Sequence, residues 1–461
     1  MVRTSMNFLK QRSEWPFWLL TSLLIILWIA GGASRADVIG QPVVRFFAWA
    51  LLIAAIVGLR EWKPVRPLAP LVFLLAAIAV CILQLLPLPP ELWTALPGRQ
   101  IIAEAAVVLD QPQPWRPISI SPSGTMNALS ALVIPFITYL LLSQLPSSRD
   151  WRLVTVIVAL AGSGVGIGLV QASGVGFDNP FLNDMAGMVS GNFANRNHFA
   201  LFIAIICLIL PAWALHGNKL NRIRLGAALI LVPLSILLSL ATGSRAGIVL
   251  TALALPIGML VVRAKLRKLL SSYPRNWILG LALLGVLGVV GLVVLSVTLD
   301  RAEAVNRAID LRSVEDLRVQ SLPILWDMII RYFPFGAGFG TFDPAFRIEE
   351  PMEFLQPAYF NHAHNDFLEV AIDGGIFGIA LLCAAFFWWA LRSFRVWLRE
   401  PDNRLGQIGS ALILLVAIGS AVDYPARTPI IMALIMIAAG WLGSKQEAPS
   451  SGALPTRPRR V

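Results

Sequence analysis

Charged side chains are scarce in this chain: Asp, Glu, Lys and Arg make up 14% of its 461 residues. A soluble globular protein usually carries about 25%. Hydrophobic residues make up 57%, and the mean hydropathy is +0.73. Apolar runs of about 18 residues or more recur from end to end, and each is long enough to cross a hydrocarbon layer roughly 30 Å thick. The composition therefore excludes an ordinary soluble enzyme and predicts an all-α, polytopic membrane protein.

Cysteine and histidine are also rare. All three cysteines lie inside apolar runs, so their spacing predicts neither a disulfide framework nor a metal site. No cluster of cysteines or acidic residues stands at the spacing of transition-metal ligands, so we predict neither a transition-metal site nor a cofactor. Whether a divalent cation binds to the acids Asp343, Glu349, Glu350 and Glu353 is left open. The chain has four histidines, and three of them fall on one predicted face: His198, His362 and His364.

The apolar runs predict about twelve transmembrane helices in a single domain over residues 1–443. A polar tail over 444–461 is expected to be disordered and cytoplasmic. The predicted spans are 15–32, 42–59, 68–87, 124–145, 151–172, 198–215, 223–241, 246–263, 277–299, 365–391, 407–422 and 428–443.

The basic residues predict the orientation. With the N-terminus inside, 24 of the 37 Lys and Arg residues fall in cytoplasmic segments, including all six lysines. The positive-inside rule then places both termini in the cytoplasm. The net charge of +11 is explained by these loops and their attraction to anionic membrane lipid, so no nucleic-acid partner is predicted.

The largest outer segment, about 300–364, separates the ninth and tenth spans. Its middle has apolar residues at helical spacing over 315–333, with an interruption at Pro323, which predicts an amphipathic helix on the membrane surface. Arg318 in this helix could reach a phosphate or pair with Glu315. The following PFGAGFGTF (334–342) has no βαβ context and is a loop over a site or a turn required by packing.

The strongest candidate base stands where this outer segment meets the tenth span. The sequence HAHND places His362 and His364 just before the helix, with Asn365 or Asp366 able to cap it. A helix N-terminus disfavours a charged imidazolium, so a neutral His364 could act as a general base. The alternative is a histidine that only caps the helix or binds water. Further along, Asp373 is a substrate carboxylate or, as we favour, a hydrogen-bond partner at a glycine kink.

Two other outer stretches could bind an anion. Arg245 stands in ATGSRAGIV between two spans with almost no loop, where a guanidinium needs an anionic partner such as a phosphate. The alternative is anchoring to lipid headgroups. The stretch GNFANRNHFALF presents Asn195 and Arg196 at the entrance to the sixth span, and these groups suit sugar hydroxyls or phosphate oxygens. Its alternative is a polar helix cap.

Together, GNFANRNHFA, TGSRAG, PFGAGFGTF and HAHNDFLEVAIDGGIFG resemble the bacterial O-antigen ligase and Wzy-type polymerase superfamily. The resemblance covers roughly residues 160–390. It implies a glycosyltransferase fold of the C type and transfer of a glycan from an undecaprenyl-diphosphate carrier at the periplasmic face of the bacterial inner membrane. The acceptor is lipid A core or another lipid-linked glycan. It also implies that arginines hold the diphosphate and a histidine deprotonates the acceptor, roles that fall on Arg196, Arg245 and His364.

The sequence leaves several alternatives open. A transporter or flippase for a lipid-linked or anionic substrate also suits twelve spans, although no matched pair of broken helices appears in two halves. A purely structural assembly partner is a third possibility. Ligase and polymerase share the motifs used here, and the sugar, the linkage and the acceptor are not encoded in them. We expect His364 to be catalytic and Arg196, Arg245, Arg318, Asn195, His362 and Asn365 to contact substrate.

Overall fold

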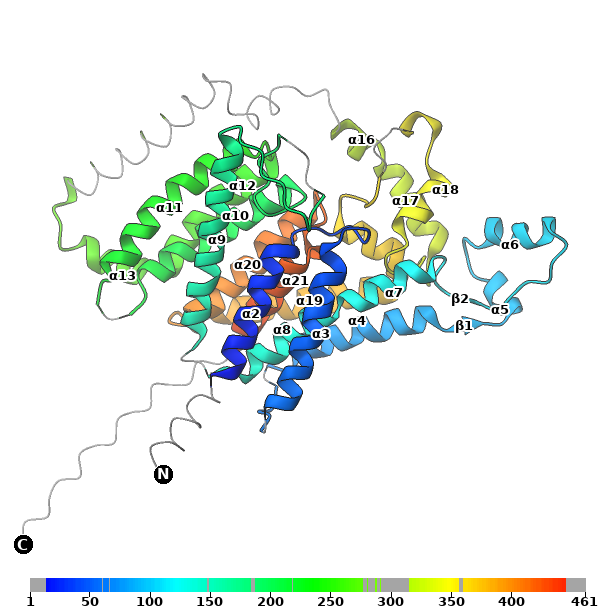
Figure 1. The fold of residues 1–461 in the computed structure, drawn as a ribbon, viewed down its shortest axis with the longest axis horizontal. Helices are drawn as coiled ribbons and strands as arrows, with labels where there is room; N and C mark the ends of the chain where they lie inside the picture. Colours follow the sequence, from blue (N-terminus) through cyan, green and yellow to red (C-terminus); the bar gives the residue numbers. More distant parts are fainter. Residues whose placement is uncertain are drawn as a thin grey trace, which may run out of the picture.

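A computed structural model describes residues 14–444, apart from 60, 66, 147–148, 184–186, 218, 277–279, 281–286, 288–290, 292–314 and 356–359. The described chain is almost entirely helical (Figure 1). Its one strand pair is a two-residue antiparallel ladder between β1 (Pro87–Leu88) and β2 (Arg116–Pro117). The predicted tail and the ninth predicted span lie mostly outside the described residues.

Apolar helices match the other eleven predicted spans. In chain order they are α2 (Trp15–Ala30), α3 (Gly40–Gly58), α4 (Ala69–Leu85), α7 (Pro122–Ala131) with α8 (Val133–Gln144), α9 (Asp150–Ala172), α10 (Arg196–Ala214), α11 (Arg222–Ala241), α12 (Arg245–Val261), α19 (Asp366–Leu398), α20 (Arg404–Ser420) and α21 (Pro429–Gly443). Six helical segments of the described chain are long and apolar enough to cross a membrane. A seventh qualifies if α12 and α13 (Arg263–Leu270), which meet at 73°, count as one span. The fold is that of a polytopic membrane protein, while the count of twelve stays a prediction.

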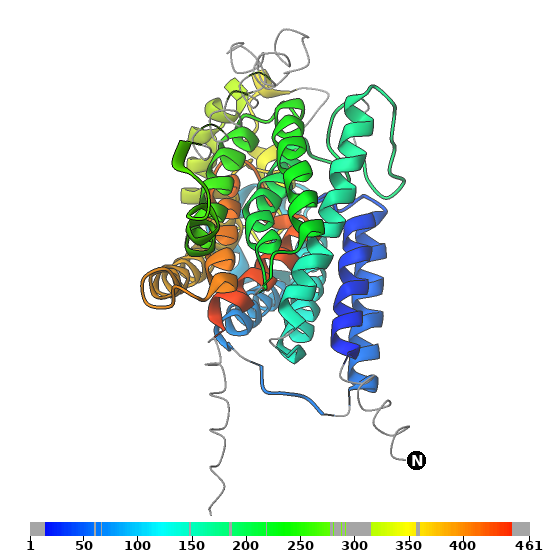
Figure 2. The same ribbon diagram turned by 90° about the vertical axis from the view of Figure 1, so that its left-hand side faces the viewer.

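Helix α10 lies at the centre of the bundle and packs against α9, α11, α12 and α20 (Figures 1 and 2). It is apolar around its whole circumference, and 94% of its span is buried, because a helix without a polar face must be covered on every side. Helix α12 approaches it closely. At Gly247 there is no room for a side chain against Ala200, and Gly258 meets the backbone of Leu208. The first turns of α10 and α12 therefore lie side by side.

Helix α19 is kinked where it meets the glycine loop 334–342. Gly375 has φ 52° and ψ −140° inside the helix, a backbone conformation suited to glycine. The loop fills the break, since Gly338 N–H donates to Asp373 O and Ile376 N–H donates to Pro334 O, both at 2.9 Å. The Asp373 carboxylate accepts the Gly340 N–H at 2.9 Å. The kink and the loop thus form one packed unit.

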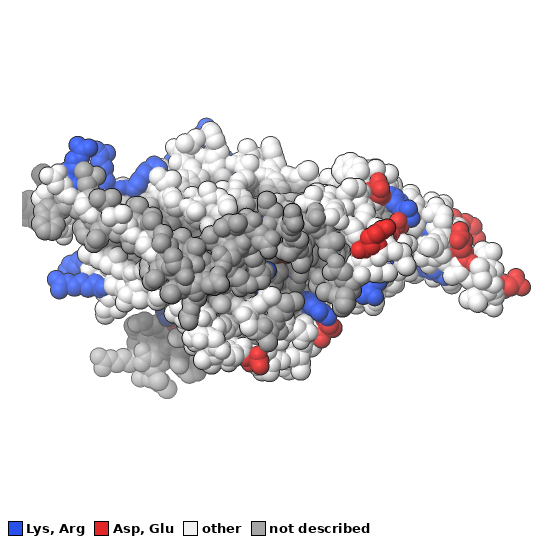
Figure 3. All heavy atoms as spheres, turned by 90° about the horizontal axis from the view of Figure 1, so that it is seen from above, with Lys and Arg blue, Asp and Glu red and all other residues white. Residues whose placement is uncertain are grey.

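The segments that the sequence predicts to lie outside the membrane form short helices around this unit. They are α5 (Pro90–Thr94), α6 (Gln100–Val108), α16 (Glu315–Gln320), α17 (Leu322–Tyr332), α18 (Phe342–Glu349) and the 3₁₀ turn η2 (Met352–Phe354). The amphipathic stretch is helical as predicted, and the helix breaks at Ser321 beside Pro323. In the view of Figure 3, acidic side chains gather toward the end where α5, α6 and α18 lie, and basic ones toward the end near α13. The described surface between them carries few charges.

Candidate active site

The short connection between α20 and α21 is the centre of the candidate site. It contains the 3₁₀ turn η3 (Pro425–Arg427) and lies against the first turns of α10 and α19. A helix cap and a contact between two side chains fix its position. Asn365 caps α19 by accepting the N–H groups of Phe367 and Leu368, and its amide donates to Ala421 O at 3.0 Å. His198, in the first turn of α10, contacts the hydroxyl of Thr428 at 2.9 Å through Nδ1.

Asp423 in this connection joins the polar starts of α10 and α19. Its side chain is buried, and Oδ2 accepts hydrogen bonds from the amides of Asn197 at 2.5 Å and Asn195 at 3.3 Å. Asn195 also caps α10, where its side-chain oxygen accepts the Asn197 N–H at 2.8 Å. The sequence leaves the stretch GNFANRNHFALF open as a ligand site or a helix cap, and the structure shows that Asn195 caps α10. Asn195 and Asn197 also hold the carboxylate of Asp423 by hydrogen bonds.

Two imidazoles face the other oxygen of this carboxylate. Asp423 Oδ1 lies 3.5 Å from His364 Nδ1 and 3.7 Å from His198 Nε2. Both contacts are longer than an ordinary hydrogen bond. With Nδ1 of His364 turned to Asp423, its Nε2 is the ring nitrogen left for a reaction partner. The ring packs edge-on against Phe360 and Tyr424, and 18% of the side chain is exposed.

The site favours a neutral His364 beside an ionised Asp423. Burial lowers the pKa of His364 below its ordinary value, and the neighbouring Asp423 only partly offsets this effect. Burial alone would raise the pKa of Asp423, but its interactions with His198 and His364 hold that pKa well below its usual range. A neutral imidazole oriented by a carboxylate can accept a proton, which is the chemistry of a general base.

Two of the predicted arginines stand at neighbouring helix starts. Arg196 and Arg245 are the first residues of α10 and α12, and both are partly buried. Their helix starts are adjacent because of the close approach of Gly247 to Ala200. Ser244 caps α12 by accepting the Gly247 N–H at 3.0 Å. Two neighbouring helix N-termini with guanidinium groups are favourable for an anion.

Arg318 reaches the same connection from α16. Its Nη1 donates to Val422 O at 3.1 Å. The guanidinium lies close enough to His364 to contribute to the lowered pKa of that imidazole. The alternative partner Glu315 has a side chain outside the described part of the structure. Arg318 therefore lies beside the candidate base.

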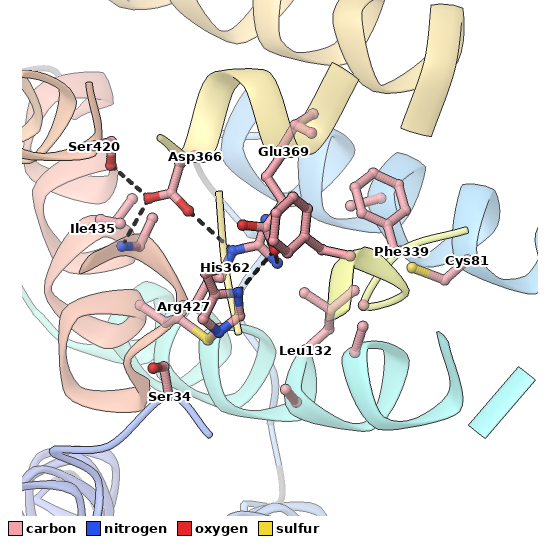
Figure 4. Close-up of a pocket in the computed structure, with 18 of the residues that line it drawn as sticks. Ser34, Cys81, Leu132, Phe339, His362, Asp366, Glu369, Ser420, Arg427 and Ile435 are labelled. Atoms are coloured by element: carbon pink, nitrogen blue, oxygen red, sulfur yellow. Dashed lines mark hydrogen bonds and ion pairs between the residues drawn. The ribbon is translucent and has the colours of Figure 1, made fainter. Parts of the chain in front are cut away.

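A second buried polar cluster lies next to the first, across the ring of Tyr424. Its members are His362, Asp366, Glu369 and Arg427 (Figure 4). His362 Nδ1 lies 2.9 Å from Glu369 Oε1, and Arg427 contacts both Glu369 and Asp366 at 3.1 Å. The carboxylates thus surround the guanidinium and balance its charge. His362, and not His364, also lines a cavity of about 940 Å³.

Sequence reasoning did not identify the roles of five residues in this region. It named Asp366 only as a possible helix cap, and it did not single out Glu369, Asp423, Tyr424 or Arg427. A signal was available, because acids in the first turn of an apolar span and an acid in a loop of a few residues are expensive at a membrane. Their pairing partners lie far away in the sequence, so the pattern alone could not join them. In the described part of the chain, no group of three His, Cys, Asp or Glu side chains is placed to hold a metal ion.

Comparison with known proteins agrees with the sequence motifs. Residues 227–383 match the family model described as O-antigen ligase, a range that includes Arg245, Arg318 and both outer histidines of the HAH motif. Arg196 and Asp423 lie outside the matched range. No curated protein matches the chain. The match supports the resemblance to the O-antigen ligase superfamily that the motifs predict, and it suggests a membrane enzyme of glycan transfer.

Proposed function

We propose that the protein is an inverting, metal-independent glycosyltransferase that takes a glycan from an undecaprenyl-diphosphate carrier and passes it to an acceptor hydroxyl at the periplasmic face of the inner membrane. The acceptor is lipid A core for a ligase, or another lipid-linked glycan for a polymerase. The observation that carries this proposal is the pairing of a neutral His364 with Asp423 beside two arginine-bearing helix starts.

The proposed reaction is a single displacement. Nε2 of His364 accepts the proton of the acceptor hydroxyl while the hydroxyl oxygen bonds to the anomeric carbon. The bond from that carbon to the diphosphate breaks, and the leaving diphosphate takes the electron pair. Arg196 and Arg245 neutralise its charge, and Arg318 orients either the diphosphate or the acceptor. Electrostatic stabilisation of this kind is usually the largest contribution to a rate enhancement.

Direct attack on the anomeric carbon inverts its configuration, and this gives one test. The product of transfer by the reconstituted protein should carry the opposite anomeric configuration to the donor, as read by NMR. Retention of configuration would exclude the single displacement and point to a covalent intermediate.

A second test separates an enzyme from the transporter alternative. We expect His364→Gln to abolish formation of new glycosidic bonds in proteoliposomes loaded with lipid-linked donor. His216→Gln is the control, because His216 stacks on Trp151 beyond the far end of α10. Movement of unchanged substrate across the bilayer, without a new glycosidic bond, would favour a transporter.

The anion-binding role of Arg245 predicts a specific kinetic change. Arg245→Gln should raise the KM for the donor by about 10- to 100-fold, since a charged hydrogen bond contributes about 1.5–3 kcal/mol. Arg245→Lys should recover part of this loss because it keeps the charge but not the planar fork. An unchanged KM in both variants would remove Arg245 from the donor site.

A further inference from the structure

The cavity beside His362 extends well beyond the candidate active site. It lies between α3, α4 and α7 on one side and α19, α20 and α21 on the other, and its volume is about 940 Å³ (Figure 4). This volume is at the upper end of the roughly 300–1,000 Å³ typical of ligand sites. Its outer rim includes Gly340 of the glycine loop and the start of α7 at Ser123. The cavity is therefore large enough to hold a ligand of its own.

The inner part of the cavity is apolar. Helices α4, α19 and α21 line it with aliphatic and aromatic side chains, including Leu74, Ala77, Trp388, Trp389 and Met436. These positions lie about one to three turns from the nearer ends of apolar helices. A hydrocarbon chain placed there would be removed from water and would contact adaptable Met and Trp side chains. The walls thus suit a lipid chain better than a sugar.

One cation at the outer part of the cavity has only neutral partners. Arg45 follows the start of α3 by five residues, roughly 7.5 Å along the helix axis. Its Nη1 donates to the side-chain oxygens of Asn127 at 2.7 Å and Ser130 at 2.9 Å, and its Nη2 donates to Gln41 Oε1 at 3.0 Å. Among the described residues, no Asp or Glu forms an ion pair with Arg45. A guanidinium in an apolar helix is expensive unless an anion accompanies it.

The other arginines that line the cavity are paired with carboxylates. Arg427 contacts Asp366 and Glu369, and Arg35 contacts Asp37 at 2.6 Å. Arg45 is therefore the lining arginine whose charge no described carboxylate balances. The positive charge of Arg45 therefore favours an anionic group at the end of the cavity that Arg45 lines, next to the apolar walls.

We propose that this cavity binds a lipid phosphate, with the hydrocarbon between α4, α19 and α21 and the phosphate on Arg45. The proposal deepens the proposed function, and it rests on that function only for the statement that the bound lipid is a substrate. It gives the enzyme a lipid site next to His362, separate from the arginines at the starts of α10 and α12.

Photolabelling of the purified full chain tests the site. The probe is an alkyl phosphate that carries a diazirine at the end of its chain, and the matched neutral probe is the corresponding alcohol. We expect the phosphate probe to label peptides that contain Leu74, Trp388 and Met436. Arg45→Gln should weaken its binding about tenfold and leave the alcohol unchanged, because only the phosphate loses a charged hydrogen bond. Arg45→Lys should keep the preference for phosphate.

Matched controls separate the cavity from general effects on the bundle. Ala385→Phe fills the cavity from α19 and should abolish labelling, whereas Ala384→Phe on the exposed face of the same helix should not. Arg392→Gln removes an arginine that donates to Leu442 O outside the cavity, and it should have no effect. Labelling of other peptides, or equal binding of phosphate and alcohol by the wild-type protein, would overturn the proposal. Equal competition by phosphatidylglycerol would identify the bound lipid as a phospholipid, whereas its failure to compete would identify a single-chain lipid phosphate.

The outcomes also distinguish this site from the proposed reaction. If His364→Gln loses transfer while Arg45→Gln binds the phosphate probe normally, the lipid site is wrong and the glycosyltransferase stands. If the wild-type protein binds the probe in the cavity but forms no glycosidic bond with any lipid-linked donor, the lipid site stands and the proposed function fails.

Discussion

His362 Nδ1 lies 2.9 Å from Oε1 of Glu369, and this contact is shorter than the 3.5 Å between His364 Nδ1 and Asp423 Oδ1. The second oxygen of Glu369 accepts the Ala363 N–H at 2.9 Å, so the carboxylate also fixes the backbone between the two histidines. Both imidazoles are therefore oriented by buried carboxylates, and they pack against the same ring of Tyr424. By geometry alone, either His362 or His364 could accept a proton.

Substitution of each histidine separates these roles. We expect His364→Gln to lower kcat by about 10²–10⁴-fold, the usual contribution of a general base. His362→Gln should lower it by less than about tenfold, because Gln can still hydrogen-bond to Glu369 while the base is retained. Single-turnover transfer with saturating donor measures both. The reverse order of effects would make His362 the base and leave His364 as the supporting residue.

Removal of the Asp423 charge should change the pH profile. Asp423 raises the pKa of His364, so Asp423→Asn lowers it further below its ordinary value. The base must be neutral, and transfer therefore rises with pH through the pKa of His364. In Asp423→Asn this acidic limb should move to lower pH, and the plateau rate should fall because a base of lower pKa accepts a proton less readily.

The matched control for this experiment is Asp178→Asn, which changes an exposed acid in the segment that leads to α10. Its acidic limb should coincide with that of the wild-type protein. If Asp423→Asn reduces the plateau rate but leaves the acidic limb of the pH profile in place, Asp423 orients the site without setting the pKa of His364.

Local patterns predicted most of the fold because the apolar length of a helix depends only on its own residues. Apolar length located helices at eleven of the predicted spans, and the caps at Asn195 and Asn365 were each among the alternatives that the sequence left open. The broken outer helix over 315–333 also followed from periodicity and Pro323. Such features depend on residues within one or two turns of each other, which a single sequence contains in full.

Long-range pairing could not be predicted in this way. Asp423 lies 226 residues from Asn197 in the sequence, yet they share a hydrogen bond of 2.5 Å. The loop that carries Asp423 is too short to show a motif. Likewise, Arg45 was counted only as one more basic residue, since its neutral partners on α7 are visible only in three dimensions. The local sequence and the family resemblance both pointed to His364, whereas the carboxylate beside it required the structure.

Glu369 should be important for stability as well as for His362. Its side chain is completely buried and pairs with Arg427, which is 19% exposed. Loss of one partner of a buried ion pair usually costs about 3–5 kcal/mol because the other charge is left without compensation. We therefore expect Glu369→Ala to lower the midpoint of thermal unfolding in detergent strongly, and Glu369→Gln to do so less, since Gln keeps hydrogen bonds to His362 and Ala363.

Glu14 offers a comparison at the other end of the bundle. It pairs with Arg149 and Arg152, whose side chains are 25% and 41% exposed, so water can replace the lost contact. A partly exposed pair contributes about 0–1 kcal/mol, and Glu14→Ala should have a small effect. Equal shifts for Glu14→Ala and Glu369→Ala would show that the cluster around Arg427 is open to water.

The kink in α19 should tolerate no side chain. A Cβ at Gly375 would lie 2.7 Å from Gly336 N and would also meet Pro334 O, and its φ of 52° favours glycine in any case. A strained backbone of this kind costs of the order of 1–3 kcal/mol before any clash. Because the break in α19 sets the direction of its first turns, Gly375→Ala should also displace His364 and reduce transfer more than it reduces folded protein. Gly166→Ala in α9 is the control, since nothing lies within 4 Å of a Cβ there. Thermal unfolding and transfer, measured on the same preparations, check both effects. Wild-type activity in Gly375→Ala would mean that the position of the base does not depend on the kink.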